Sequence, residues 1–234
     1  MPQTFLNRSL AVATAATFVL APALADTLYD DFKTKWRPLQ FGTGAATSMV
    51  RNRLEITLEA VAAGSGQDFF GSGLFSTCAL KGDFDLRASY RLLDWPEHNG
   101  TRVALFLGSM ADLPTDNGIF IERDSYSEAD ADVPFDLYVF FAEQGVQLIE
   151  HETDHQSGLL RLRRVGPVVT GYYKSDSDWV EMGSTNLGTQ SLRFAVVTYS
   201  HDSVFADANV RASFEGVRLA AGSFTGATCP VSTP

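Results

Sequence analysis

The sequence predicts an all-β protein, built as a two-sheet antiparallel β-sandwich or a barrel. Short segments that alternate apolar and polar residues recur about every ten to fifteen residues, and Gly, Asn, Asp or Pro lies between them. After residue 25, no segment keeps the 3.6-residue apolar period of a helix. Many short antiparallel strands must be stacked or closed to bury their apolar faces.

The first 25 residues are typical of a secretory signal peptide. Arg8 is the single charge, a nearly uncharged run extends from Leu10 to Leu24, and the small-x-small pattern at residues 23–25 predicts cleavage after Ala25. Residues 26–234 are then expected to form one domain, secreted to the periplasm or beyond, with no membrane insertion. The net charge of −10 argues against nucleic acid as a partner.

Cys78 and Cys229 are the two cysteines of the chain. An exported protein meets an oxidising compartment, where an even pair is expected to form a disulfide. The alternative is a pair of free, buried thiols. The predicted bridge would tie the segment before the central strands to the C-terminal tail.

The strands are expected to follow one another along the mature chain. Their predicted ranges are 27–32, 53–58, 72–80, two arms within 82–108, 117–124, 136–142, 145–150, 158–165, 168–174, 179–182, 191–200 and 210–219. Residues 42–48 and 64–66 are rich in Gly, Ser and Thr, so we expect loops there.

Residues 82–108 contain the clearest pair of strands, and we expect a β-hairpin with its turn at Asn99-Gly100. Side chains alternate between the two faces of a strand, so every second residue shares a face. The residues expected in the core are Phe84, Leu86, Ala88, Tyr90 and Leu92 in the first arm and Val103, Leu105 and Leu107 in the second. Trp179, Tyr90 and Phe194 are the expected core aromatics.

Several segments resemble one superfamily. Residues 157–173 (SGLLRLRRVGPVVTGYY), followed by Asp178-Trp179-Val180, resemble the strand, tight turn, strand and Trp pattern of concanavalin A-like lectin/glucanase jelly rolls, including the laminin-G-like ones. Residues 83–105 and 214–222 are similar to matching segments of the same group. The resemblance implies a two-sheet antiparallel β-sandwich of the jelly-roll type, and departures from the enzyme patterns of the group favour its non-catalytic branch. This superfamily holds lectins, adhesion modules, hydrolases and lyases, so the fold does not fix the function.

Two patterns resemble those of enzymes. The segment from His151 to His155 matches the zinc motif H-E-x-x-H. That motif binds zinc only when a helix places both histidines on one face. Here a predicted strand precedes the segment and Ser157-Gly158 follows it, so a polar loop is predicted instead. Glu122 and Asp124 with Glu128 resemble the E-x-D-x-E or E-x-D-x-x-E strand of jelly-roll glucanases. Six residues of strand would separate the two glutamates by roughly 20 Å, whereas retaining hydrolysis needs carboxyls about 5 to 5.5 Å apart. We therefore predict no catalytic residue, with a polysaccharide hydrolase or lyase as the alternative.

The outer face of the central strands is the candidate binding surface. Counting alternate positions places on it the predicted ligand-binding residues Arg91, Arg102, Glu122, Asp124, Tyr138 and Phe140, with Phe106 and Phe120 beside them. The expected core set that alternates with them includes Tyr90, Val103, Leu105, Ile121, Val139 and Phe141. Aromatic rings stack on sugars, and arginine and carboxylate groups hydrogen-bond hydroxyls, so a carbohydrate or cell-surface glycan is the predicted partner. The competing interpretations are that loops cover this face, or that the protein is a structural or adhesion surface protein without a small ligand.

No cofactor is predicted. The resemblance implies a structural calcium ion near the joined chain ends, for which Asp31 and Glu215 are the nearest matches. Glu215-Gly216 stands where the family usually has Asp-Asn, which departs from the calcium pattern. The sequence indicates no oligomeric state.

Overall fold

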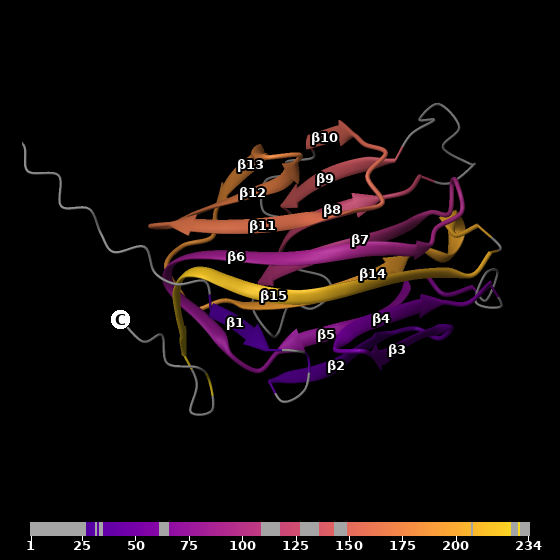
Figure 1. Cartoon of the computed structure of the whole chain (residues 1–234), viewed down its shortest axis with the longest axis horizontal. Coiled ribbons are helices and arrows are strands. Elements are labelled where there is room, and N and C mark those ends of the chain that lie inside the picture. The colour runs from indigo at the N-terminus through magenta and orange to yellow at the C-terminus, as the bar shows by residue number, and fades with distance from the viewer. Residues whose placement is uncertain are drawn as a thin grey trace, which may run out of the picture.

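The structure is a computed structural model, which describes residues 27–30, 32, 35–60, 66–108, 118–126, 136–142, 149–206, 208–225 and 229. The predicted signal peptide lies outside the described residues. The described part consists of two antiparallel β-sheets packed face to face (Figure 1), so the predicted all-β sandwich is confirmed.

The strands fall into two sheets. The eight-stranded sheet contains β1 (Thr27–Asp30), β3 (Ala45–Val50), β4 (Arg53–Leu58), β6 (Ala79–Asp94), β11 (Ser157–Val165), β12 (Val168–Ser175), β13 (Asp178–Asn186) and β15 (Val210–Thr225). Its order is β13-β12-β11-β6-β15-β4-β3, with β1 paired to β15. The seven-stranded sheet contains β2 (Trp36–Phe41), β5 (Phe70–Ser76), β7 (Thr101–Gly108), β8 (Ile119–Asp124), β9 (Leu137–Ala142), β10 (Ile149–Glu152) and β14 (Arg193–Ser200). Its order is β10-β9-β8-β7-β14-β5-β2.

Helix is scarce in the described ranges. The short 3-10 helix η3 (Asp202–Val204) follows β14. None of the described residues belongs to a helix with the length and apolar character needed to cross a bilayer.

β6 and β7 lie in different sheets, so the predicted hairpin over residues 82–108 is wrong. β6 pairs with β11 and β15, whereas β7 pairs with β8 and β14. Residues 95–100 therefore carry the chain across one end of the sandwich. The turn signal was real: Gly100 has a φ of 68° and lies against the backbone of Val204, where a Cβ would clash. Alternation fixes which residues face the core, but it does not choose the neighbouring strand.

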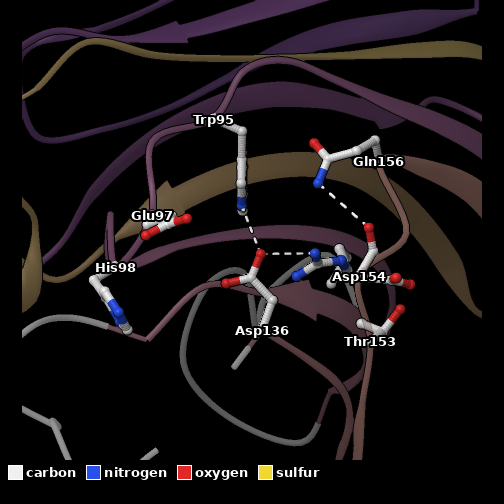
Figure 2. A pocket seen from close by; sticks show the side chains of 8 residues that line it. Trp95, Glu97, His98, Asp136, Thr153, Asp154 and Gln156 are labelled. Atoms are coloured by element: carbon white, nitrogen blue, oxygen red, sulfur yellow. Dashed lines mark hydrogen bonds and ion pairs between the residues drawn. The ribbon is translucent and has the colours of Figure 1, made fainter. Parts of the chain in front are cut away.

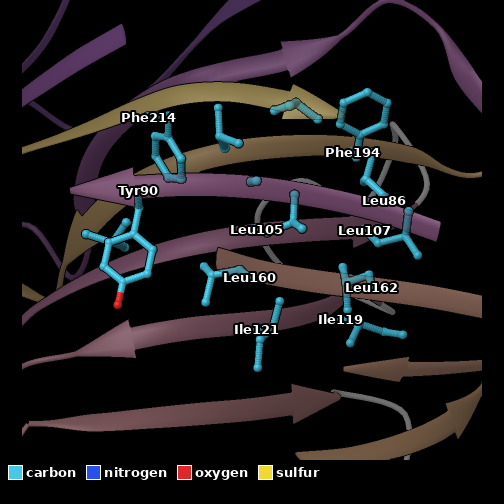
Figure 3. Packing of buried hydrophobic residues seen from close by; sticks show 14 of the residues in the cluster. Leu86, Tyr90, Leu105, Leu107, Ile119, Ile121, Leu160, Leu162, Phe194 and Phe214 are labelled. Carbon is cyan, nitrogen blue, oxygen red and sulfur yellow. The ribbon is translucent and has the colours of Figure 1, made fainter. Parts of the chain in front are cut away.

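The space between the sheets is filled by one apolar core (Figure 3). All eight core residues predicted for the two arms are buried, as are Leu160 and Leu162 of β11. Tyr90 and Phe194 are buried as predicted. In Figure 3 side chains from β6, β11 and β15 meet those from β7, β8 and β14, so the core lies between the two sheets.

Trp179 is not a core residue, which corrects the sequence prediction. It lies half-buried on the edge strand β13, where the guanidinium carbons of Arg87 and Arg161 are 5.4 Å and 5.0 Å from its ring centroid. Both arginines also pair with Asp85, at 3.0 Å and 2.6 Å. Cation–π contacts therefore hold this ring on the outer surface of the eight-stranded sheet.

Two edge strands were missed by the sequence analysis. Residues 45–48 belong to β3, although they lie in the segment predicted as a loop, and β2 contains Pro38. Proline is tolerated on edge strands, and β2 and β3 are the last strands of their sheets. β10 begins at Ile149, and the earlier part of the predicted strand 145–150 lies outside the described residues.

Cys78 and Cys229 form the predicted disulfide, with their Cα atoms 5.8 Å apart. Cys78 is buried beside β5 and β6, and Cys229 packs against the main core from beyond β15. The bridge therefore ties Cys229, beyond the last strand, to the connection between β5 and β6.

Candidate functional site

A group of polar side chains lies on the outer face of the seven-stranded sheet, where β8, β7 and β14 are neighbours. Strand register places Arg102 of β7 opposite Asp124 of β8 on one side and Tyr199 of β14 on the other. Arg102 Nε is 3.4 Å from Asp124 Oδ2, and the Tyr199 hydroxyl donates to Glu122 Oε1 at 2.5 Å. We call Arg102, Glu122, Asp124 and Tyr199 the acid–arginine cluster.

Burial changes the acidity of both carboxyls in this cluster. Glu122 is 3% exposed and Asp124 is 5% exposed. The loss of hydration raises the pKa of Asp124 to about 6. It raises the pKa of Glu122 well above the usual value, and the neighbouring charge of Asp124 raises it further. Burial therefore favours the neutral form of both carboxyls, and the facing guanidinium of Arg102 opposes this shift in each of them.

Two polar atoms of the cluster lack a hydrogen-bond partner among the described residues. They are Arg102 Nη1, a donor, and Asp124 Oδ1, an acceptor, and both are buried. A buried polar atom without a partner costs about 1 to 3 kcal/mol. The cluster therefore holds, beneath the surface, a donor and an acceptor with no such partner, on the two members of a single ion pair.

Replacing Glu122 with glutamine should reduce the dependence of stability on pH. A carboxyl whose pKa is raised by folding stabilises the folded state most at low pH, and that contribution falls as pH rises from about 4 through its folded pKa. The free energy of unfolding of the wild type should therefore drop between pH 4 and pH 8, and less so in Glu122→Gln, which still accepts from Tyr199. Urea unfolding across this range measures the effect. Glu215→Gln, in an exposed ion pair, is the control, and equal slopes for both variants would contradict the prediction.

Half of the six predicted ligand-binding residues meet in this cluster. Arg102, Glu122 and Asp124 take the outward positions that the alternation predicted. Arg91 does not join them, because β6 belongs to the other sheet, where its side chain is 52% exposed and pairs with Glu215 at 3.1 Å.

Tyr138 and Phe140 face the core, so their predicted outward placement is wrong. Both are 0% exposed. The Tyr138 hydroxyl is hydrogen-bonded to the Tyr90 hydroxyl at 2.7 Å. The ring of Phe140 lies over Gly171 and Gly183, where a Cβ would approach it to within 2.4 Å and 2.9 Å. Those two glycines leave room for the ring inside the sandwich.

The outer positions of β9 belong instead to Val139 and Phe141, which were predicted to be core residues. Val139 pairs with Glu122, and Phe141 packs beside the outer apolar cluster. The buried members of that cluster are Phe75, Ala104, Phe106, Phe120, Ala195, Val197 and Tyr199. Phe106 and Phe120 thus lie outward, as predicted, in a second apolar layer next to the acid–arginine cluster.

Tyr126 occupies the next outward position along the line of β8, where the E-x-D-x-E pattern of glucanases would have its last glutamate. Its hydroxyl donates to Glu150 Oε1 of β10 at 2.7 Å. Glu128 lies outside the described residues. Among the residues that the structure describes, the strand therefore offers Glu122 and Asp124 with a tyrosine, not a third carboxylate, at position 126.

The H-E-x-x-H segment is not helical. His151 and Glu152 belong to β10, and residues 153–155 follow it without regular structure. His151 and His155 therefore do not share a helix face. Within the described ranges, no three His, Cys, Asp or Glu side chains are grouped closely enough to hold a metal ion. Asp31, one of the two calcium candidates, lies outside those ranges, and Glu215 pairs with Arg91.

A second candidate site is a pocket of about 330 Å³ at the end of the sandwich where residues 95–100 cross between the sheets. We call it the end pocket (Figure 2). Its lining residues are Trp95, Glu97, His98, Arg123, Asp136, Thr153, Asp154 and Gln156. They come from four separate segments, and only Thr153 and Asp154 fall within a pattern noted in the sequence, the H-E-x-x-H segment. Sequence reasoning therefore missed this site.

The polar groups of the end pocket are fixed by one buried arginine. Arg123 is 0% exposed and donates to Asp136 Oδ2 at 2.7 Å, to the Asp124 carbonyl at 2.8 Å and to the His155 carbonyl at 3.2 Å. Trp95 Nε1 donates to the same Asp136 Oδ2 at 3.1 Å. Figure 2 shows the indole directed at the Asp136 carboxylate, so an aromatic ring and a carboxylate are held together in the pocket.

No family model matches this sequence, and no curated protein matches it. Solved structures do resemble the fold. The exoplasmic/lumenal domain of VIP36 in its Ca2+/Man3GlcNAc-bound form has a TM-score of 0.56 and 12% identity, over 83% of this chain and 86% of that chain. A prokaryotic β-1,3-1,4-glucanase (lichenase) from a mouse hindgut metagenome has a TM-score of 0.58 and 10% identity, over 83% and 97%. A lectin from Bauhinia forficata in complex with GalNAc has a TM-score of 0.55 and 8% identity, over 83% and 96%. At these identities the likeness establishes the fold.

Proposed function

We propose that this chain, whose fold is that of the concanavalin A-like lectins and glucanases, is a secreted lectin-like module that binds a glycan on the outer face of its seven-stranded sheet. The structures of similar fold include a VIP36 domain bound to Man3GlcNAc and a lectin bound to GalNAc. The observation that carries the proposal for this chain is the free donor and free acceptor of the acid–arginine cluster.

A sugar with two neighbouring hydroxyls satisfies both atoms at once. One hydroxyl donates to Asp124 Oδ1, and the other accepts from Arg102 Nη1, because a hydroxyl can serve as donor or acceptor. Arg102 lies on the side of the cluster that is open to solvent, and 26% of its side chain is exposed. The ligand therefore approaches from the Arg102 side.

Aromatic rings lie next to this open side. Phe69 is 4.9 Å from the ring of Tyr199 and 5.4 Å from that of His201, measured between ring centroids. Burial lowers the pKa of His201, which keeps its imidazole neutral at neutral pH. These rings take the stacking role that the sequence analysis gave to Tyr138 and Phe140, which are enclosed in the core.

The charge of the site favours a neutral sugar over an acidic one. Asp124 is the free acceptor, and the Glu150 carboxylate lies close enough to raise the pKa of Asp124. A ligand carboxylate would meet both charges. Affinity should be modest, with a dissociation constant of roughly micromolar to millimolar, because few polar contacts offset the cost of ordering the ligand.

Secretion is part of the proposal. The predicted signal peptide and the disulfide both fit an oxidising compartment, periplasmic or extracellular. An N-terminus at Asp26 in protein recovered from the exporting cell would support it, and a chain retained with residues 1–25 intact would contradict it.

A glycan array with matched variants tests the binding face. Wild type should bind a neutral glycan. Asp124→Asn should weaken that binding at least tenfold, because one of the two carboxylate oxygens that accept hydrogen bonds becomes an amide nitrogen and the charge that faces Arg102 is lost. Arg91→Ala is the control, since it removes an arginine from the other sheet and should leave binding unchanged. Titration calorimetry then measures each dissociation constant. Equal affinity of Asp124→Asn and wild type would exclude this face, and no binding to any glycan would favour a structural surface protein.

A further inference from the structure

The end pocket is lined by more carboxylates than cationic side chains. Asp136 Oδ2 already accepts from Arg123 and Trp95, and the carboxylates of Glu97 and Asp154 add further acceptors. Arg123 uses all three of its side-chain nitrogens on protein acceptors. The lining thus combines three carboxylates with one guanidinium, so a ligand that donates hydrogen bonds and carries positive charge is favoured.

The pocket also has the size and rigidity of a small-molecule site. Its volume of about 330 Å³ lies at the lower end of the roughly 300 to 1,000 Å³ typical of ligand sites. The indole of Trp95 forms one wall, and its bond to Asp136 fixes the ring before any ligand arrives. An aromatic face attracts a nearby cation. A preformed site also avoids the free-energy cost of ordering its side chains when the ligand binds.

We propose that the end pocket binds one hydroxylated ring with a protonated amine, the chemistry of an amino sugar. The ammonium group pairs with the Asp136 carboxylate, which is held beside Trp95, and the ring lies against Trp95. The carboxylates of Glu97 and Asp154 add to the negative potential of the pocket. The hydroxyls donate to the remaining carboxylate oxygens. This site is distinct from the acid–arginine cluster, because Arg123 points inward between the sheets whereas Asp124 points outward.

The test is a titration of the mature, disulfide-bonded protein at pH 6 with three probes: glucosamine, glucose and N-acetylglucosamine. At this pH the free amine is protonated, whereas the acetylated amine carries no charge. Glucosamine should bind at least tenfold more tightly than either neutral sugar, with the affinity falling as salt is added. Equal affinities for the three probes, or no binding of glucosamine, would overturn the proposal.

Variants separate this pocket from the proposed glycan site. Glu97→Gln and Asp154→Asn keep side-chain size and should each weaken glucosamine binding at least fivefold, while Glu215→Gln and Asp124→Asn should leave it unchanged. If Asp124→Asn alone abolished glucosamine binding, the ligand would occupy the outer face and the end pocket would be excluded. Ca2+ binding that shows the same loss in Glu97→Gln and Asp154→Asn, without glucosamine binding, would identify a metal site instead and overturn the proposal.

Discussion

Removing the disulfide should lower the free energy of unfolding by about 5 kcal/mol. Cys78 and Cys229 are 151 residues apart in the sequence, and cross-linking so long a loop removes much of the conformational entropy of the unfolded chain. The chain-entropy relation gives about 5 kcal/mol for a loop of this length at 25 °C. Cys78→Ala with Cys229→Ala is the variant, and urea unfolding at pH 7 is the measurement.

Fully reduced wild type is the matched control for that variant. It should unfold at nearly the same urea concentration as the double alanine variant, because both lack the cross-link and differ only by two sulfur atoms. The unfolded chain is also more open without the bridge, so it exposes more surface. The free energy of unfolding of both proteins should therefore fall more steeply with urea concentration than that of the oxidised protein. A loss below about 1 kcal/mol, or two alkylatable thiols in native exported protein, would contradict this account.

The sequence was most informative where alternation is strict. Residues 84–92 place apolar and polar side chains on opposite faces, and the alternate apolar positions of residues 103–107 mark the inner face of the second arm. The structure buries the predicted core set of both arms. Glu122 and Asp124 followed from the same argument, because carboxylates cannot occupy the core side of a strand without partners. Alternation is local, so it gave the faces of β6 and β7 but not their membership of different sheets.

Alternation fails in β9, where five consecutive residues, Leu137 to Phe141, are apolar or aromatic. Both faces of this strand contact apolar layers, so the pattern does not tell which side is inside. The deciding feature lies elsewhere in the chain: Gly171 and Gly183 leave the space that Phe140 fills. The end pocket escaped prediction for the same reason, since its residues meet only when four distant segments fold together.

Replacing Arg123 with methionine should cost about 3 to 5 kcal/mol of stability. The guanidinium is fully buried and pairs with Asp136, and the His155 and Asp124 carbonyls accept from its other nitrogens. Methionine fills part of the volume but donates no hydrogen bond, so both carbonyls lose this donor and the Asp136 carboxylate loses its cationic partner while it keeps the bond from Trp95. Breaking a buried pair from one side typically costs this much, because the remaining charge is uncompensated. Urea unfolding at pH 7 measures the loss.

Arg91→Met is the matched control, because it removes an exposed arginine from the ion pair with Glu215 and should cost less than about 1 kcal/mol. A double-mutant cycle with Asp136→Asn then isolates the free energy that the pairing of Arg123 with the Asp136 carboxylate contributes to stability. Arg123→Met with Asp136→Asn should be less destabilised than the sum of the two single variants, since no unpaired carboxylate remains. If the two losses add to within about 0.5 kcal/mol, Arg123 stabilises the end of the sandwich by packing and by its bonds to the carbonyls, and its pairing with Asp136 contributes little.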